Sequence, residues 1–368
     1  MNYTKKEKVP QQYSHIDLNV ADQNYLREIT DFYESIGHPN CKPHLHLLVE
    51  ERLGVRSKYF LPDALRSPII NVLNGTDRKK IIDKNIYPLI VKTDRQPQNV
   101  IRGVRGRFFL ADNSETRWLD AFQQLRQDVE YVVKPALTAS GNKVARCRRD
   151  GNRMLVNDEL TTIDQFLHRY SMDFTIQEMI GQSNIIGQIH PHSVNSIRMV
   201  TLRWNQEIRF IMAFLRVGAN GLVNDNAATG GLCVGICQDG ELDSCAFDKV
   251  GRKHRKHPST GFDFQNKKIR IPNYQKFKDF VISLHTDILF HDLVSWDIAV
   301  GEDNLPFFIE HNFAGQFWIY QLATGQPLFG DLSGEILPFV IEQDKKIKRS
   351  TPTLMSKAWK YFKPRLLR

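Results

Sequence analysis

Apolar positions recur at helical spacing through the first part of the chain. Three runs carry apolar residues three or four positions apart, and each run ends at a glycine: 25–37, 44–54 and 67–75. A glycine after such a run is typical of a helix end, and Ser67 with Pro68 is typical of a helix start. We therefore predict a mostly helical region over residues 1–82. A polar run, Asp83-Lys84-Asn85, follows it.

From about residue 87 the pattern changes to short apolar or alternating runs, which are typical of strands. The predicted strands are 87–92, 105–111, 130–136, 152–157, 174–180, 196–204, 207–218, 230–237, 267–272, 294–300 and 305–312. Helices are predicted over 118–127 and 273–289 and again near the C-terminus. Alternation in the middle strands favours an antiparallel sheet with one covered face. The predicted fold class is α+β rather than a doubly wound parallel sheet.

Composition narrows the class of protein. The 368 residues are 41% hydrophobic and 25% charged, which is typical of a globular chain of two or three lobes. No apolar run of 18 residues occurs, so we expect no spanning helix. The net charge of +9 is concentrated in residues 344–368, where nine Lys or Arg accompany one acid and leave the remainder near neutral. A nucleic-acid partner is therefore not expected for the body of the protein.

The two strands 294–300 and 305–312 carry the strongest chemical signal. Asp297 lies among apolar residues, and Glu310 and Asn312 project to one face because strand side chains alternate. If the two strands pair, three oxygen ligands converge, which is the donor type that Mg²⁺ prefers. The alternative is that these acids accept hydrogen bonds in the interior or end their strands in solvent.

A second segment has residues suited to phosphate. Strand 130–136 delivers Lys134 to a turn of small residues containing Ser140, Gly141 and Lys143. Small residues let backbone N–H groups approach phosphate, and lysine supplies a point charge. The segment matches neither the P-loop nor the dinucleotide-binding glycine pattern, and an ordinary hairpin turn remains the alternative.

Polar residues in and beside three other apolar segments are further candidates. Gln177, Glu178, Met179 and Ile180 end a strand that could link two lobes and pair with an adenine edge. Arg198 and Arg216 lie inside apolar strands and need an anionic partner, either a protein carboxylate or a substrate group. Asn226 lies in a polar, glycine-containing loop between strands, where function often resides.

Taken in order, these segments resemble the ATP-grasp enzymes, and more narrowly the branch associated with sugar transfer and polysaccharide biosynthesis. The resemblance covers roughly residues 83–331 and rests on ordered motifs: Lys134 with its small-residue turn, Gln177-Glu178, Asn195-Ser196-Ile197-Arg198, Asp225-Asn226 with Gly230-Gly231, Trp296-Asp297, and Ile309-Glu310 with Asn312. The resemblance implies two α+β lobes that clasp a nucleotide. The implied division is a helical region 1–82, a first lobe 83–180, a second lobe with the metal site 181–343, and a basic tail 344–368.

The resemblance also implies roles for the candidate residues. Mg²⁺, as one or two ions with Mn²⁺ as a substitute, is expected on Asp297, Glu310 and Asn312. ATP is expected on Lys134, Ser140, Gly141, Lys143, Gln177, Glu178, Met179 and Ile180, with Arg198, Arg216 and Asn226 on the substrate side. The implied activity is a carboxylate–amine ligase that forms an amide through an acyl phosphate.

Alternative activities remain open at this point. The implied partners are a small carboxylate and an amine, from a sugar, a glycan precursor, a lipid-linked sugar or an amino acid. A kinase of the same fold and a non-catalytic module that binds an anionic polymer are the alternatives.

The basic tail is a separate question. Its lysines, arginines and aromatic residues resemble an interfacial segment, so residues 344–368 are expected either to touch the inner face of a membrane or to pack on the body with solvated lysines. The expected location is cytoplasmic.

Overall fold

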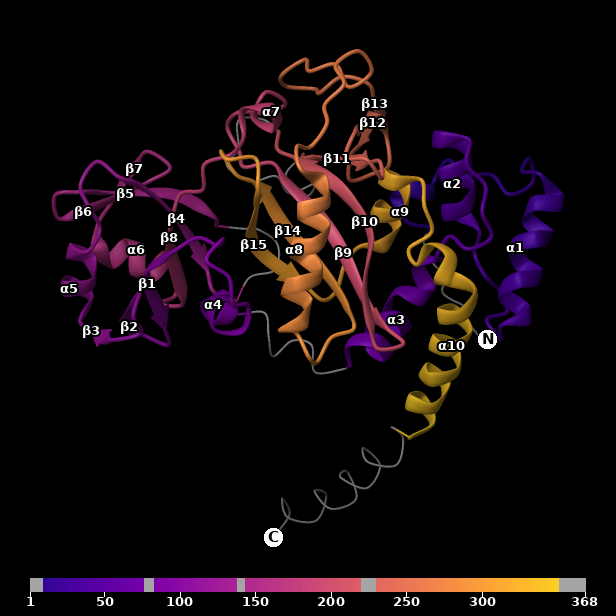
Figure 1. Ribbon diagram of the computed structural model, residues 1–368, viewed down its shortest axis with the longest axis horizontal. Coiled ribbons are helices and arrows are strands. Elements are labelled where there is room, and N and C mark those ends of the chain that lie inside the picture. Colours follow the sequence, from indigo (N-terminus) through magenta and orange to yellow (C-terminus); the bar gives the residue numbers. More distant parts are fainter. Residues whose placement is uncertain (1–8, 76–82, 138–142, 220–229, 351–368) are drawn as a thin grey trace, which may run out of the picture.

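A computed structural model describes residues 9–75, 83–137, 143–219 and 230–350. The elements fall into an N-terminal helical region, an 8-stranded sheet and a 7-stranded sheet, with a long helix near the C-terminus (Figure 1). The α+β class predicted from the sequence is confirmed. The candidate residues Ser140, Gly141 and Asn226 lie outside the described residues.

The N-terminal region consists of short helices packed on one face of the 7-stranded sheet. Its elements are η1 (Gln11–Tyr13), α1 (Gln23–Ser35), α2 (His44–Leu53), η2 (Asp63–Leu65) and α3 (Arg66–Asn74). Asp22 caps α1 by accepting from the backbone N–H groups of Asn24 and Tyr25. Gly54 ends α2 in the left-handed conformation at a φ of 71°, as predicted from its position after the apolar run.

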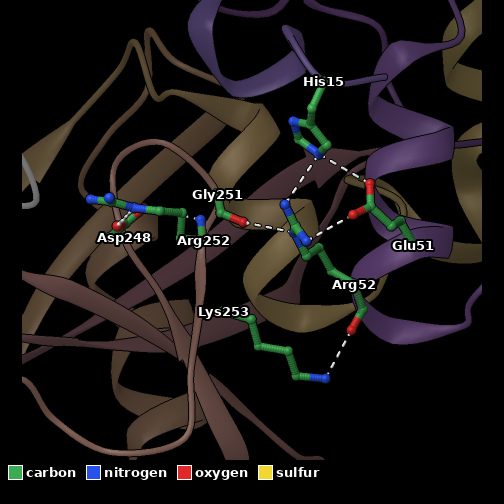
Figure 2. Close-up of polar contacts among 7 residues, drawn as sticks. All are labelled: His15, Glu51, Arg52, Asp248, Gly251, Arg252 and Lys253. Atoms are coloured by element: carbon green, nitrogen blue, oxygen red, sulfur yellow. Dashed lines mark hydrogen bonds and ion pairs between the residues drawn. The ribbon is translucent and has the colours of Figure 1, made fainter. Parts of the chain in front are cut away.

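Polar contacts as well as apolar packing hold this region to the body. Arg52 Nε donates to the carbonyl of Gly251 at 3.2 Å, and Lys253 Nζ donates to the carbonyl of Arg52 at 2.8 Å (Figure 2). His15 and Glu51 contact the Arg52 guanidinium from the other side. The buried core beneath is shared with the second sheet and with two later helices, so the region is an integral part of the second lobe.

Between the helical region and the first sheet, residues predicted as a strand form a helix instead. The segment 87–92 contributes α4 (Tyr87–Ile90), preceded by the 3-10 turn η4 (Lys84–Ile86). Asp83 accepts from the Asn85 N–H, and a proline occupies the first turn, where its fixed φ suits a helix and its missing N–H is not needed. The strand prediction was wrong because a short apolar run does not distinguish strand from helix.

The 8-stranded sheet has the order β3-β2-β1-β8-β4-β5-β6-β7, and neighbouring strands in it are antiparallel. Its strands and helices are β1 (Asn99–Val104), β2 (Arg107–Leu110), β3 (Glu115–Thr116), α5 (Trp118–Gln123), β4 (Glu130–Pro135), β5 (Ala145–Asp150), β6 (Arg153–Val156), β7 (Glu159–Thr161), α6 (Ile163–Arg169) and β8 (Phe174–Glu178). An aromatic core that includes Trp118, Phe166 and Phe174 joins the helices to one face.

The 7-stranded sheet has the order β13-β12-β11-β10-β9-β14-β15 and is also antiparallel. Its elements, with the short helix before it, are α7 (Asn184–Gly187), β9 (Ser196–Trp204), β10 (Glu207–Val217), β11 (Leu232–Ile236), β12 (Leu242–Phe247), β13 (Lys253–His254), α8 (Tyr274–Thr286), β14 (Leu293–Val300), β15 (Pro306–Asn312), α9 (Phe317–Thr324), η6 (Gly330–Leu332) and α10 (Ser333–Ser350). The predicted strand 267–272 is absent from the described elements; a single bridge from Arg270 to Glu241 takes its place.

Each face of this sheet has its own cover. Helix α8 packs on one face, over a core that contains Val294, Trp296 and Ile298. Helices α9 and α10 and the N-terminal region cover the other face, over Val200, Phe214 and their neighbours (Figure 1). The predicted start of the basic tail, residue 344, lies inside α10, and Lys345 Nζ donates to the carbonyl of Gly37 at 2.8 Å. No helix among the described residues is long and apolar enough to cross a bilayer.

Buried histidines make the stability of this fold depend on pH. Burial lowers the pKa of His46 from 6.5 to about 4, and that of His285 likewise to about 4. As pH falls from about 6.5 toward 4, the unfolded chain takes up these protons before the folded chain does, so the free energy of unfolding should fall. His46 alone should contribute about 3 kcal/mol across this window. Denaturant titrations at several pH values measure the slope. A His46→Gln variant should have a smaller slope, and an unchanged slope would contradict the assignment.

Candidate functional site

The strands β14 and β15 form the hairpin that the sequence predicted, and their register brings the three candidate metal ligands together. Asp297 pairs with Glu310, and Ser295 pairs with Asn312. A β-bulge next to Asp297 leaves Ile309 as the extra residue on β15. Paired residues of an antiparallel ladder project to the same face, so the two carboxylates and the amide share one face of the hairpin.

Asp297 is the most tightly held member of this set. It is 2% exposed, and its carboxylate accepts from the guanidinium groups of both Arg198 and Arg216. Arg198 Nε donates to one oxygen, while Arg198 Nη2 at 3.0 Å and Arg216 Nη1 at 2.8 Å share the other. Burial alone would raise the pKa of Asp297, but the two arginines outweigh it and lower the pKa. The sequence left open which anion these arginines meet, and the structure identifies Asp297 as a partner of both.

A tyrosine that the sequence did not single out completes the Arg198 environment. Tyr320, from α9, accepts from Arg198 Nη1 at 2.6 Å and donates to Ser295 Oγ at 3.3 Å. The guanidinium is therefore fixed by contacts on three of its nitrogens. No sequence signal marks Tyr320, because it lies within an apolar helical run whose residues mostly pack in the core.

Glu310 differs from Asp297 in its electrostatics. Burial raises its pKa, the neighbouring Asp297 charge raises it further, and Lys84, Lys134 and Arg216 lower it by less. Two facing carboxylates in a buried site repel each other unless a proton or a cation lies between them. For Glu310, burial and the Asp297 charge therefore outweigh the three positive side chains that stand close to it.

These residues fit a magnesium ion. Two carboxylates and one amide oxygen supply hard ligands, and the ordinary Mg²⁺ site takes its other ligands from phosphates and water. Asn312 Nδ2 has no hydrogen-bond partner within the described residues, so no donor contact of that amide opposes turning its oxygen to a cation. Nowhere in the described ranges do three or more His, Cys, Asp or Glu side chains gather to hold a metal.

Two lysines approach the hairpin from the side of the first sheet. Lys134 lies on β4, opposite Thr175 of β8, on the face that does not pack on the aromatic core. The Lys84 backbone N–H donates to the carbonyl of Ala136 at 3.0 Å, so η4 is tied to the end of β4. Lys84 is 7% exposed, and its polar run was visible in the sequence, but only the fold brings it to Glu310.

The predicted adenine segment, residues 177–180, lies at the end of β8. Gln177 is 7% exposed and donates through Nε2 to Asn99 Oδ1 at 2.8 Å, while its Oε1 has no partner in the described part of the chain. Glu178 is exposed at the end of β8, and the half-buried Met179 and Ile180 follow it toward the second sheet. This position between the two sheets is the one expected of a linker.

Lys143 is turned away from the hairpin. Its Nζ donates to the carbonyl of Arg169, at the end of α6, at 3.0 Å. In this arrangement one of its three N–H donors contacts the first lobe itself. The roles predicted for Lys143 and for the other nucleotide residues remain predictions.

Comparisons with known proteins identify the family of this chain. A family model described as sugar-transfer associated ATP-grasp matches residues 109–334, which is more than half of the sequence. The chain belongs to the sugar-transfer associated ATP-grasp family. The resemblance inferred from the ordered motifs is thereby confirmed, and the ATP-grasp fold accounts for the two sheets with a candidate site between them.

Solved structures similar to this ATP-grasp chain include an L-amino acid ligase from Bacillus licheniformis, at 11% identity and a TM-score of 0.39, over 71% of this chain and 47% of that one. The ATP-grasp ligase PsnB, complexed with minimal precursor, Mg and ADP, has 14% identity and a TM-score of 0.38, over 74% and 62%. D-alanine–D-alanine ligase from Bacillus anthracis has 13% identity and a TM-score of 0.36, over 78% and 75%. This chain thus spans less than two thirds of the length of the first two. No curated protein matches the sequence.

Because the two carboxylates have unequal environments, we expect their replacement by amides to affect stability differently. Asp297→Asn leaves two buried guanidinium groups without their carboxylate and should lower the free energy of unfolding by about 3–5 kcal/mol. Glu310→Gln removes a carboxylate that repels Asp297 and should leave the metal-free protein equally stable or more stable. Denaturant titration in the presence of EDTA measures both. An equal loss in the two variants would contradict the proposed division of charge.

Proposed function

We propose that this chain is an ATP-dependent carboxylate–amine ligase that uses Mg²⁺. The observation that carries the proposal is the set of buried Asp297 with half-buried Glu310 and Asn312 on one face of the β14–β15 hairpin. Lys84 and Lys134 bring positive charge to Glu310 from the other lobe. Membership of the ATP-grasp family supports ATP as the nucleotide.

Each group has a proposed part in the reaction. Asp297, Glu310 and Asn312 would hold the metal, which supplies charge neutralisation on the phosphates. Lys84 and Lys134 would bind phosphate oxygens, with Ser140, Gly141 and Lys143 near them. The segment from Gln177 to Ile180 would bind the adenine. Arg198 and Arg216, already oriented by Asp297, would face the transferred phosphoryl group, and Asn226 would lie on the substrate side.

The proposed chemistry has two steps. A carboxylate oxygen of the substrate attacks the γ-phosphorus of ATP, the bond to the β,γ-bridging oxygen breaks, and ADP leaves. The amine nitrogen then attacks the acyl carbon, the bond to the phosphate oxygen breaks, and phosphate leaves as the nitrogen loses a proton. The protein contributes positioning and preorganised positive charge, which act on the charge that develops in each step.

The substrate class is a finer proposal. The description of the family as sugar-transfer associated supports a carboxylate or an amine borne by a sugar, a glycan precursor or a lipid-linked sugar. An amino acid is the other substrate we consider. The proposed setting is polysaccharide biosynthesis in the cytoplasm.

Release of ADP with a panel of carboxylates and amines tests ligation. Turnover should need both substrates, and with the carboxylate alone ¹⁸O in the β,γ-bridge of ATP should scramble. Glu310→Gln should lower kcat at least about a hundredfold because a charge-stabilising group is lost, while Glu207→Gln, at an exposed ion pair with Arg209, should match the wild type. ADP formed with a hydroxyl acceptor and no carboxylate would identify a kinase and reject the ligase.

We also propose that the basic tail contacts an anionic membrane. Residues 351–368 contain five Lys or Arg, no acid, and the aromatic residues Trp359, Tyr361 and Phe362. Because the described part of α10 reaches Ser350, a truncation after residue 350 removes these residues and keeps every described residue of the helix. Full-length protein should co-sediment with phosphatidylserine vesicles more than the truncated chain does, and the difference should shrink in high salt. Equal sedimentation would reject the contact.

A further inference from the structure

The helical N-terminal region contains no motif that assigns it a role. Its helix α3 nevertheless contacts the β14–β15 hairpin at two places, the start of β14 and the residues that follow β15. Asn74, the last residue of α3, is 4% exposed and exchanges two hydrogen bonds with Leu293, the first residue of β14: its Nδ2 donates at 2.8 Å and its Oδ1 accepts at 2.9 Å. Next to this contact, the Asp292 N–H donates to the Leu73 carbonyl at 3.1 Å. Strand β14, which carries Asp297, is therefore hydrogen-bonded to α3 at its first residue.

The same helix also holds the chain where β15 ends. Directly after Asn312, three consecutive carbonyls accept from side chains of α3. Asn74 Nδ2 donates to Phe313 at 3.0 Å, Arg66 Nη2 donates to Ala314 at 2.9 Å, and Arg66 Nε donates to Gly315 at 2.6 Å. Arg66 and Asn74 are the first and last residues of α3, so the helix spans the end of the hairpin as a brace.

The braced segment leads to the arginine that holds Asp297. A Cβ on Gly315 would lie 2.5 Å from the Tyr320 hydroxyl, so the backbone at this glycine passes directly against that group. The same hydroxyl accepts from Arg198, and Arg198 pairs with Asp297. Movement of Gly315 would therefore displace Tyr320 and, through it, the Arg198 guanidinium. Movement of Phe313 would displace Asn312, because the two residues are joined by a peptide bond.

We propose that Arg66 is a positioning residue for the metal and phosphoryl site, with Asn74 as its partner on the same helix. This proposal rests on the proposed function of the β14–β15 hairpin. Arg66 fixes the peptide groups after Asn312 by donating from two nitrogens to two successive carbonyls, and a lysine can reproduce only part of this contact because it is a single point donor. The helical region thus contributes to catalysis by geometry, without contact to nucleotide or metal.

Loss of this brace should weaken metal binding and slow the chemical step more than it weakens ATP binding. The nucleotide would be held mainly by the first sheet and residues 177–180 at the end of β8, whereas the hydrogen bonds of α3 given above go to the two ends of the β14–β15 hairpin. A displacement of about 1 Å at reacting groups costs on the order of a hundredfold in rate. We expect Arg66→Gln to lower kcat ten- to a hundredfold and to change the KM for ATP by less than threefold.

The decisive measurement is Mn²⁺ binding, followed by electron paramagnetic resonance on the full chain with a non-hydrolysable ATP analogue. Arg66→Gln should weaken Mn²⁺ binding about tenfold, and Arg66→Lys should restore part of the loss because it keeps the charge. The matched control is Arg209→Gln, an exposed arginine whose partner is Glu207 at the β9–β10 turn. Thermal unfolding of each variant checks that the protein is folded at the temperature of measurement.

The outcomes separate this proposal from the function on which it rests. Wild-type Mn²⁺ affinity and kcat in folded Arg66→Gln, with both lost in Glu310→Gln, would overturn the positioning role and leave the metal site standing. Unchanged Mn²⁺ affinity in Glu310→Gln as well would overturn the metal site itself. An equal loss of kcat and of ATP affinity in Arg66→Gln, without rescue by lysine, would show a general structural role and also reject the proposal.

Discussion

The burial of Asp297 between two arginines is the constraint on which the second lobe depends. A carboxylate that is 2% exposed is costly without cations, and Arg198 and Arg216 supply them from the two strands β9 and β10. Because Asp297 is opposite Arg198 in the ladder, the ion pair and the strand register specify each other. A slip of β14 by one residue would turn Asp297 toward the apolar core beneath α8 and separate it from both arginines.

This arrangement explains why Glu310 is available for a cation. The arginines of the second sheet are directed mainly at Asp297, so Glu310 faces a neighbouring negative charge with little compensation from its own sheet. The additional positive charge comes from Lys84 and Lys134, which are tied to the end of the first sheet. A polyphosphate with a bound metal ion would suit these residues, because the metal ion would pair with Glu310 and the phosphates with the two lysines.

The sequence predicted the parts of the site that depend on local pattern and missed those that depend on strand order. Alternation along one strand was sufficient to place Glu310 and Asn312 on one face, and the turn between two apolar runs was sufficient to predict their hairpin with Asp297. The partner of Arg198 and Arg216 could not be predicted, because it follows from β14 lying beside β9. Tyr320 was missed because it lies in an apolar helical run, and the approach of Lys84 to Glu310 follows only from how the first sheet lies against the hairpin. The failed strand at residues 87–92 was a short apolar run, which fits either a strand or a helix.

The position of the hairpin at the edge of its sheet makes the supports outside the sheet important. Among the strands that the structure describes, β15 has a partner on one side only, and an edge strand is freer to shift than a central one. On its open side the Phe308 N–H donates to the Arg95 carbonyl at 2.8 Å, and Arg95 Nε donates to the Pro306 carbonyl at 2.6 Å. Arg95 thus holds the start of β15, and α3 holds its end. Glu310 and Asn312 lie between these two supports, so the geometry of a metal site on this strand is set by segments that contribute no ligand to it.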